Sequence, residues 1–298
     1  MKFTYTLLLS AFCIASQPAQ ANINIAFDYT YDTNHFFADT SRQTLLNAAA
    51  SVFETRFTDN LTEIASSDTN HFNIDFANPS SAQTTSLPNY SVARDKVVVF
   101  VGAYNLGNNV LGQGGPGGFN VSGTTQAFVD NAASRGQLGA LGAPASQTDF
   151  GPWGGTLSFN NTSIYYFGTD APPPATTGFD FYSVAVHELG HLLGFGTADS
   201  YYHYVANGVF TGPEVNTLTP NPSVTNDGHW AAGTKYLGQE AAMTPGIAAG
   251  QRKRFTELDF AAMKDIGWQV TAVPEPETWG MLLAGLGLLG WRIRCRNG

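Results

Sequence analysis

Residues 180–194 of the chain read DFYSVAVHELGHLLG. The apolar residues of this stretch recur at helical spacing, which predicts one helix that stops at Gly194, where glycine suits a left-handed cap. Inside the helix, His187 and His191 lie four residues apart, so both imidazoles lie on the same face. Two imidazoles on one face can bind a single metal ion.

The residue after the first histidine supplies a second reason to predict metal chemistry. Zinc binds neutral imidazole nitrogens, and catalytic zinc sites add a third protein ligand and keep one position for water. Glu188 is placed to act on that water as a general base and then to return the proton to a leaving amine. The alternative is that two histidines stack by chance around an unrelated glutamate.

With Gly194, the pattern extends to HExxHxxG, and this resembles the metzincin clan of zinc proteases. In that clan the glycine allows a sharp turn after the helix, and most members take their third ligand from a histidine three residues further on. That position is Thr197 in this chain. Because threonine is not a preferred zinc ligand, the simple metzincin pattern is broken here.

Several residues downstream are candidates for the third ligand. Asp199 and His203 follow the helix closely, whereas His229 lies further along in the sequence DGHW. A glutamate-ligated protease would use a carboxylate instead, and the chain offers Glu214, Glu240 and Glu257.

The order of motifs after the helix resembles the leishmanolysin-like branch of the metzincins, in which an insertion separates the glycine from the third histidine. The chain has His229-Trp230, then Met243-Thr244-Pro245, then a closing helix within 256–268. This resemblance covers residues 180–268. It implies Zn²⁺ as cofactor, His229 as the third ligand beside the two helix histidines, and Met243 as a hydrophobic floor beneath the metal.

Cysteine usage departs from that branch. Leishmanolysin-type enzymes are disulfide-rich and use a propeptide cysteine for latency. Here the two cysteines are Cys13 and Cys295, so residues 22–272 contain none. Neither feature carries over to this chain.

The rest of the chain fits an α+β (mixed α/β) fold. We expect a strand within 22–30, a helix within 39–57, a buried strand at 96–102, short strands at 155–159 and 163–167, and a last helix at 257–266. The resemblance arranges them as a metzincin-like zincin. Its upper lobe would hold a mixed twisted sheet and helices, and its irregular lower lobe a Met-turn and the closing helix, with the HExxH helix between them.

Two glycine-rich stretches bear on substrate binding. Residues 154–158 are interpreted as an exposed edge strand that adds a substrate strand, with an ordinary sheet strand as an equal alternative. Residues 111–119 are interpreted as a long surface loop, with a mobile flap as the alternative.

The two ends of the chain read as targeting segments. Residues 1–21 have the layout of a secretory signal peptide that is cleaved after Ala21. Residues 273–298 resemble the PEP-CTERM sorting signal of Gram-negative bacteria, in which an exosortase recognises the motif Pro274-Glu275-Pro276. The apolar run 278–291, followed by three arginines, predicts transient membrane contact. The domain expected between the two ends is 22–272.

Composition excludes two classes of protein. The 298 residues are 43% apolar and 12% charged, which excludes a disordered acidic chain. The net charge is −9 and the basic residues form no stripe, so no nucleic-acid partner is expected.

These features together predict a zinc-dependent endopeptidase that is secreted or held at the cell surface and acts on proteins or peptides. Two alternatives stay open. One is a non-enzymatic extracellular matrix or adhesion protein, and the other is a zinc hydrolase of a non-peptide bond.

Overall fold

The largest sheet of the structure has four strands and lies at the centre of the fold. The computed structural model describes residues 22–139, 149–169, 171, 173–175 and 178–272, and within them the chain is a mixed α/β protein with six α-helices and several sheets. The four-stranded sheet has the order β1-β4-β7-β5, with β5 antiparallel and the other three parallel. Its strands are β1 (Asn24–Asp28), β4 (Lys96–Tyr104), β5 (Gly112–Pro116) and β7 (Gly154–Asn160).

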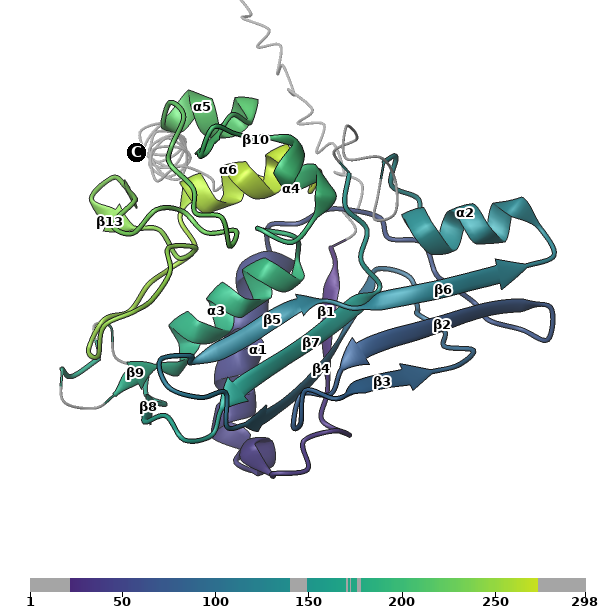
Figure 1. Ribbon diagram of the computed structural model, residues 1–298, viewed down its shortest axis with the longest axis horizontal. Helices are drawn as coiled ribbons and strands as arrows, with labels where there is room; N and C mark the ends of the chain where they lie inside the picture. The colour runs from purple at the N-terminus through teal and green to yellow at the C-terminus, as the bar shows by residue number, and fades with distance from the viewer. Residues whose placement is uncertain (1–21, 140–148, 170, 172, 176–177, 273–298) are drawn as a thin grey trace, which may run out of the picture.

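Two helices cover one face of this sheet (Figure 1). They are α1 (Thr40–Glu54) and α3 (Phe181–Leu192), and each is capped by an aspartate whose carboxylate accepts a backbone N–H in the first turn. Both helices pack on the same side of β4, against Val97, Val99 and Val101. Successive side chains of β4 point to opposite faces of the sheet, and those on the other face are apolar too. That face must therefore be covered by another element.

A second sheet and a helix cover that other face. The sheet has the order β3-β2-β6, with β2 (Asn70–Ala77), β3 (Thr84–Leu87) and β6 (Gly118–Gly123), and α2 (Gln126–Ser134) follows it. Phe76 of β2 stacks on Phe100 of β4 with ring centroids 4.2 Å apart. This sheet is missing from our sequence prediction, although Phe72, Ile74 and Phe76 alternate as a half-buried strand requires.

Of the two interpretations of residues 154–158, the exposed edge strand is wrong and the ordinary sheet strand is confirmed. Strand β7 lies between β4 and β5 and is buried along its whole length, so residues 154–158 are interior. The edge is β5, which the sequence analysis assigned to a loop because its five residues, GQGGP, lack the β-branched and aromatic residues that favour strands. Main-chain pairing to β7, rather than propensity, makes β5 a strand.

The chain after α3 is irregular, as predicted, and lies on the other side of α3 from the sheets (Figure 1). It holds only short elements before the last helix: α4 (Asp199–His203), β10 (Val205–Ala206), β11 (Val209–Phe210), α5 (Pro213–Leu218), β12 (Lys235–Tyr236) and β13 (Gln239–Glu240). The remaining short elements are η1 (Phe36–Ala38), β8 (Tyr165–Tyr166) and β9 (Phe179–Asp180).

The closing helix α6 (Glu257–Asp265) is confirmed, with Thr256 as its N-cap in a full capping box. Just beyond it, Trp268 stacks on Phe57 after α1, with ring centroids 4.7 Å apart, and its Nε1 donates a hydrogen bond to the carbonyl of Leu193 after α3. One indole therefore links the ends of three helices.

Both targeting segments, including the exosortase motif and the apolar run 278–291, lie outside the described residues. In the part of the chain that the structure describes, no helix is long and apolar enough to cross a membrane.

A buried carboxylate at this junction makes stability depend on pH. Both oxygens of Asp59 accept a hydrogen bond from the Gln269 amide, and burial raises the pKa of Asp59 to about 6. An aspartate in an unfolded chain has a pKa of about 3.9. The folded state therefore binds more protons between these two values, and stability falls as pH rises from about 4 to about 6.

We expect Asp59→Asn to remove this component while its amide oxygen still accepts the Gln269 N–H. The loss of unfolding free energy between pH 4 and pH 7 should shrink by roughly 2 kcal/mol, since one pKa unit is worth about 1.4 kcal/mol. Urea titrations at the two pH values measure it. Asp68→Asn, on an exposed segment, is the control and should leave the pH dependence unchanged. An unaltered dependence in Asp59→Asn would contradict the assignment.

Candidate metal centre

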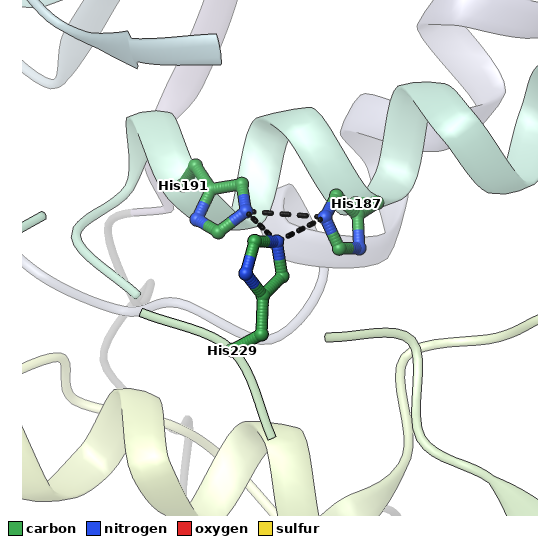
Figure 2. A group of neighbouring side chains, drawn as sticks. All are labelled: His187, His191 and His229. Carbon is green, nitrogen blue, oxygen red and sulfur yellow. Dashed lines mark hydrogen bonds between the residues drawn. The ribbon is translucent and has the colours of Figure 1, made fainter. Parts of the chain in front are cut away.

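Three imidazole nitrogens converge on one point. The Nε2 atom of His187 lies 3.1 Å from Nε2 of His191 and 3.1 Å from Nε2 of His229, and the last two atoms are 3.0 Å apart (Figure 2). These three residues form the group of side chains suited to hold a metal ion in the described part of the chain. The two residues predicted on the helix and the one predicted downstream therefore meet.

The first two rings are positioned by helix α3. Its N-terminus is held by Asp180, whose carboxylate accepts hydrogen bonds from the Ser183 amide and hydroxyl and forms a two-pronged ion pair with Arg252 at 2.7 and 2.9 Å. Arg252 belongs to the chain that follows the Met243 turn. The helix is therefore fixed to the irregular region that carries the third ring.

Two glycines allow that region to return to the helix. A Cβ atom on Gly196 would lie 2.2 Å from the carbonyl oxygen of Gly228, and both residues have positive φ, 70° and 81°. Only glycine permits this backbone contact and this conformation without strain. The contact places His229, the next residue, opposite the end of α3.

A buried carboxylate holds the third ring's segment in place. Asp259 of α6 accepts hydrogen bonds from the Trp230 indole (2.9 Å), from the amides of Ala242 (3.1 Å) and Met243 (3.3 Å), and from the Thr256 amide and hydroxyl (2.7 and 2.8 Å). It joins the residue after His229, the methionine turn and the cap of the closing helix.

The side chain of Met243 lies against Gly190 of helix α3. Its side chain is fully buried, and a Cβ atom on Gly190 of α3 would lie 2.5 Å from its sulfur. The Trp230 amide donates to the Met243 carbonyl at 2.9 Å. The methionine therefore packs against the histidine helix while its backbone pairs with the segment of His229.

The hydrogen bonds of the rings determine where their lone pairs point. Nδ1 of His187 lies 2.7 Å from the Ala242 carbonyl, and Nδ1 of His191 lies 2.8 Å from the Phe195 carbonyl. A carbonyl only accepts, so each Nδ1 carries the proton and each Nε2 presents a lone pair. Two buried lone pairs thus point at each other and at His229, an arrangement that a cation would stabilise.

The third ring has a different outer contact. Nδ1 of His229 lies 3.2 Å from a carboxylate oxygen of Asp227, close enough for an ion pair but without hydrogen-bond direction, and the described residues offer it no hydrogen-bond partner. Contacts with Thr225 and then His229 lower the pKa of Asp227. An ionised carboxylate beside Nδ1 favours the tautomer in which the Nε2 lone pair also joins the cluster.

The dimensions and protonation of the cluster fit zinc. Nitrogens 3.0–3.1 Å apart lie about 1.8 Å from the centre of their triangle, slightly less than the ~2.0–2.1 Å of a zinc–nitrogen bond, so one ion can contact all three. Burial lowers the pKa of His187 well below its ordinary value and that of His191 to about 4. Both rings are therefore neutral at neutral pH, as metal ligation requires.

Glu188 lies between the ring cluster and the sheet edge. It exposes only 7% of its surface, and burial raises its pKa to about 8, an effect partly offset by the Gly114 amide. A Cβ atom on Gly112 would lie 2.9 Å from a carboxylate oxygen of Glu188. The glycines of β5 are therefore what leaves room for this side chain against the edge strand.

A cavity of about 360 Å³ opens beside the cluster. Its lining includes Val184, His187, Glu188, His229, Ile247 and Lys253. The buried ammonium of Lys253 is held by Glu240 (2.8 Å), the Thr244 hydroxyl (2.5 Å) and the Gly246 carbonyl (2.5 Å). All three of its N–H donors are used, so the charge at this end of the cavity is already compensated.

The other predicted ligands lie elsewhere in the structure. Asp199 and His203, on α4, are outside the metal-binding group, and the Thr197 hydroxyl donates to the His191 carbonyl at 2.6 Å. The three glutamates weighed as ligands form ion pairs instead: Glu214 with Lys264, Glu240 with Lys253 and Glu257 with Arg56, each at 2.8 Å.

Sequence reasoning missed two parts of the site. Asp259 carries a detectable signal, because Thr256 and Asp259 have the spacing of a capping box, but that signal says nothing about Trp230 or the methionine turn. The role of β5 was hidden because its glycines resemble those of a loop.

Comparisons with known proteins identify only the tail. The PEP-CTERM protein-sorting motif matches residues 272–297, and this motif implies processing by an exosortase and sorting to the cell surface. No curated protein and no solved structure matches the chain. The chain from 22 to 271 therefore has no family assignment.

We expect the protein to bind zinc through this cluster and His229→Ala to lose it. Removing one of three ligands should lower the metal content from stoichiometric to a small fraction, measured by elemental analysis after dialysis. His203→Ala is the control, because it removes the nearest alternative histidine, and it should retain zinc. If the two variants bind equal amounts of zinc, His229 is not a ligand.

Asp259→Asn tests whether the hydrogen bonds to the Asp259 carboxylate position the His229 ring. An asparagine keeps the shape but turns an NH₂ group toward N–H donors, so we expect zinc affinity to fall roughly 10- to 100-fold, the usual effect of removing an outer-shell partner. Asp265→Asn is matched in helix and burial, but Asp265 accepts from Glu214 and Val215 of α5 instead. It should lose stability without losing zinc affinity. Equal zinc affinities in both variants would contradict the role of Asp259.

Proposed function

We propose that the protein is a zinc-dependent endopeptidase of the cell surface or exterior, with a metzincin-like site of the leishmanolysin type. The observation that carries this proposal is the convergence of the three Nε2 atoms of His187, His191 and His229 beside the buried carboxyl of Glu188. A matrix or adhesion protein has no need for a carboxyl next to three converging lone pairs.

In this proposal each site residue has a separate task. The three histidines hold Zn²⁺, which when bound polarises the scissile carbonyl and lowers the pKa of a water molecule. Glu188 takes a proton from the attacking water and gives it to the leaving amine nitrogen as the C–N bond breaks. Burial raises the pKa of this carboxyl and a cation held by the neighbouring histidines would lower it, and a carboxyl with a pKa near the ambient pH can both take up and return a proton.

The free edge of β5 supplies a binding site for the peptide backbone. The Leu111 carbonyl accepts from Asn160, and the Gly117 amide donates to Gly154, so these residues face β7. Because backbone groups alternate along a strand, those of Gly112 and Gly114 face away from β7, beside Glu188. A peptide that adds to this edge as a strand would pass the metal centre in an extended conformation.

Glu188→Gln tests the proposal directly. We expect peptide release from unfolded casein to fall roughly 100- to 10,000-fold, the usual contribution of a general base, while zinc content is unchanged because Glu188 is not a ligand. Chelation of zinc from the native protein should abolish the same activity.

The remaining outcomes favour the alternatives. A zinc-loaded native protein that leaves casein intact would indicate a different bond as substrate. A protein with neither zinc nor activity would indicate the matrix or adhesion role.

A further inference from the structure

Strands β5 and β6 form one long unpaired edge. They are consecutive in the chain, separated only by Gly117, and each is the edge strand of its own sheet. We call residues 112–123 the β5–β6 ribbon. Figure 1 shows the two strands end to end, with β7 and β2 on the same side of the ribbon. On the other side no strand of the described residues pairs with either of them, although α3 contacts β5 and α2 contacts β6.

The junction between the two strands is held by a buried indole. Nε1 of Trp153 lies within hydrogen-bond distance of the carbonyls of Gly117 (3.1 Å) and Gly118 (3.2 Å). A Cβ atom on Gly117 would lie 2.1 Å from the indole ring, so no side chain fits there. The fully buried Trp153 therefore holds the two strands in one line.

The backbone of β6 faces outward at alternate residues. On β2, the Phe72 amide donates to the Ser66 hydroxyl (3.1 Å) and its carbonyl accepts from Tyr90 (2.7 Å), so Phe72 turns away from β6. Phe72 is paired with Val121. In an antiparallel ladder both members of such a pair turn their backbone groups outward, so Val121 and, by alternation, Phe119 present N–H and C=O groups at the free edge.

The ribbon carries few of the devices that normally protect a strand edge. Native edges are protected by charged side chains, prolines, bulges or covering segments. Residues 111–123 read LGQGGPGGFNVSG and contain no charge, and Pro116 is their one interruption. Six glycines leave the backbone accessible, so this edge is suited to pair with another extended chain.

We propose that the β5–β6 ribbon docks a long extended segment of the substrate, on the N-terminal side of the bond to be cut. This inference rests on the proposed peptidase function, because it takes the occupant to be the substrate. The ribbon begins at Gly112, beside Glu188, and β6 then extends away from α3 (Figure 1). Antiparallel pairing, the more stable mode, then places the residues that precede the scissile bond along it.

The proposal specifies the class of substrate. At about 3.3 Å per residue, twelve residues of ribbon span roughly 40 Å, so the preferred substrate is an unfolded segment with some ten residues before the cut. Uncharged segments should suit this edge best.

Peptide binding to the Glu188→Gln protein tests this without relying on turnover. Fluorescein-labelled peptides of an uncharged Thr- and Val-rich sequence would be compared by anisotropy: a six-residue core, the core extended by eight residues at its N-terminus, and the core extended by eight at its C-terminus. We expect the N-terminal extension to lower Kd roughly tenfold, the effect of one or two net hydrogen bonds, and the C-terminal extension to leave it unchanged.

A matched pair of variants assigns the gain to the ribbon. Val121→Pro removes an outward N–H without removing a bond to β2, whereas Val121→Ala keeps that N–H and loses the same side-chain packing. We expect the gain to disappear in Val121→Pro and to remain in Val121→Ala. Equal binding of all peptides, a gain from the C-terminal extension, or equal effects of the two variants would overturn the proposal.

The outcome can be separated from that of the proposed function. Cleavage of casein without any length dependence in binding would leave the peptidase and remove the ribbon. If binding depends on peptide length and Val121→Pro abolishes that dependence, but the native protein cuts no peptide, the docking role of the ribbon stands and the peptidase function is excluded.

Discussion

The carboxylate of Asp259 is the interaction on which the candidate site depends. It is fully buried, and desolvation raises its pKa, so only a dense set of donors makes its burial tolerable. Those donors come from the segment of His229, the methionine turn and the cap of α6. Without it, the third ring would be attached to a long irregular loop, because His229 lies 38 positions after His191.

The sheet imposes the second constraint. Helix α3 can lie close to the edge strand only because β5 has glycines at the two positions that face Glu188: a Cβ at Gly114 would lie 2.3 Å from the Glu188 carbonyl. The same glycines leave the outer backbone groups of β5 uncovered by side chains of the strand itself, although the Gly114 amide already lies against Glu188. One compositional feature therefore allows both the packing of the histidine helix and an open edge beside it.

Helices and their caps could be predicted from the sequence because they depend on interactions between residues a few positions apart. The helical spacing within 39–57, 180–194 and 257–266 predicted α1, α3 and α6, and the caps Asp39, Asp180 and Thr256 follow from short-range hydrogen bonding. The sheet of β2, β3 and β6 was missed, and the sequence did not distinguish an edge strand from an interior strand at β7. Strand order depends on pairing between segments far apart in the sequence, as in β4 with β7, and local patterns do not carry that information.

The sequence by itself determined that His187, Glu188 and His191 share a helix, because the apolar residues around them recur at helical spacing. In such a helix the two histidines, four residues apart, lie on one face. It also determined the tail motif, and it left His229, His203 and Asp199, with three glutamates as further alternatives, as candidates for the third ligand. Only the tertiary structure decided that His229 joins the cluster rather than His203 or Asp199, through the Gly196–Gly228 contact and the Asp259 hydrogen bonds. The physical reason is that the position of His229 depends on contacts between residues far apart along the chain, which local sequence patterns do not reveal.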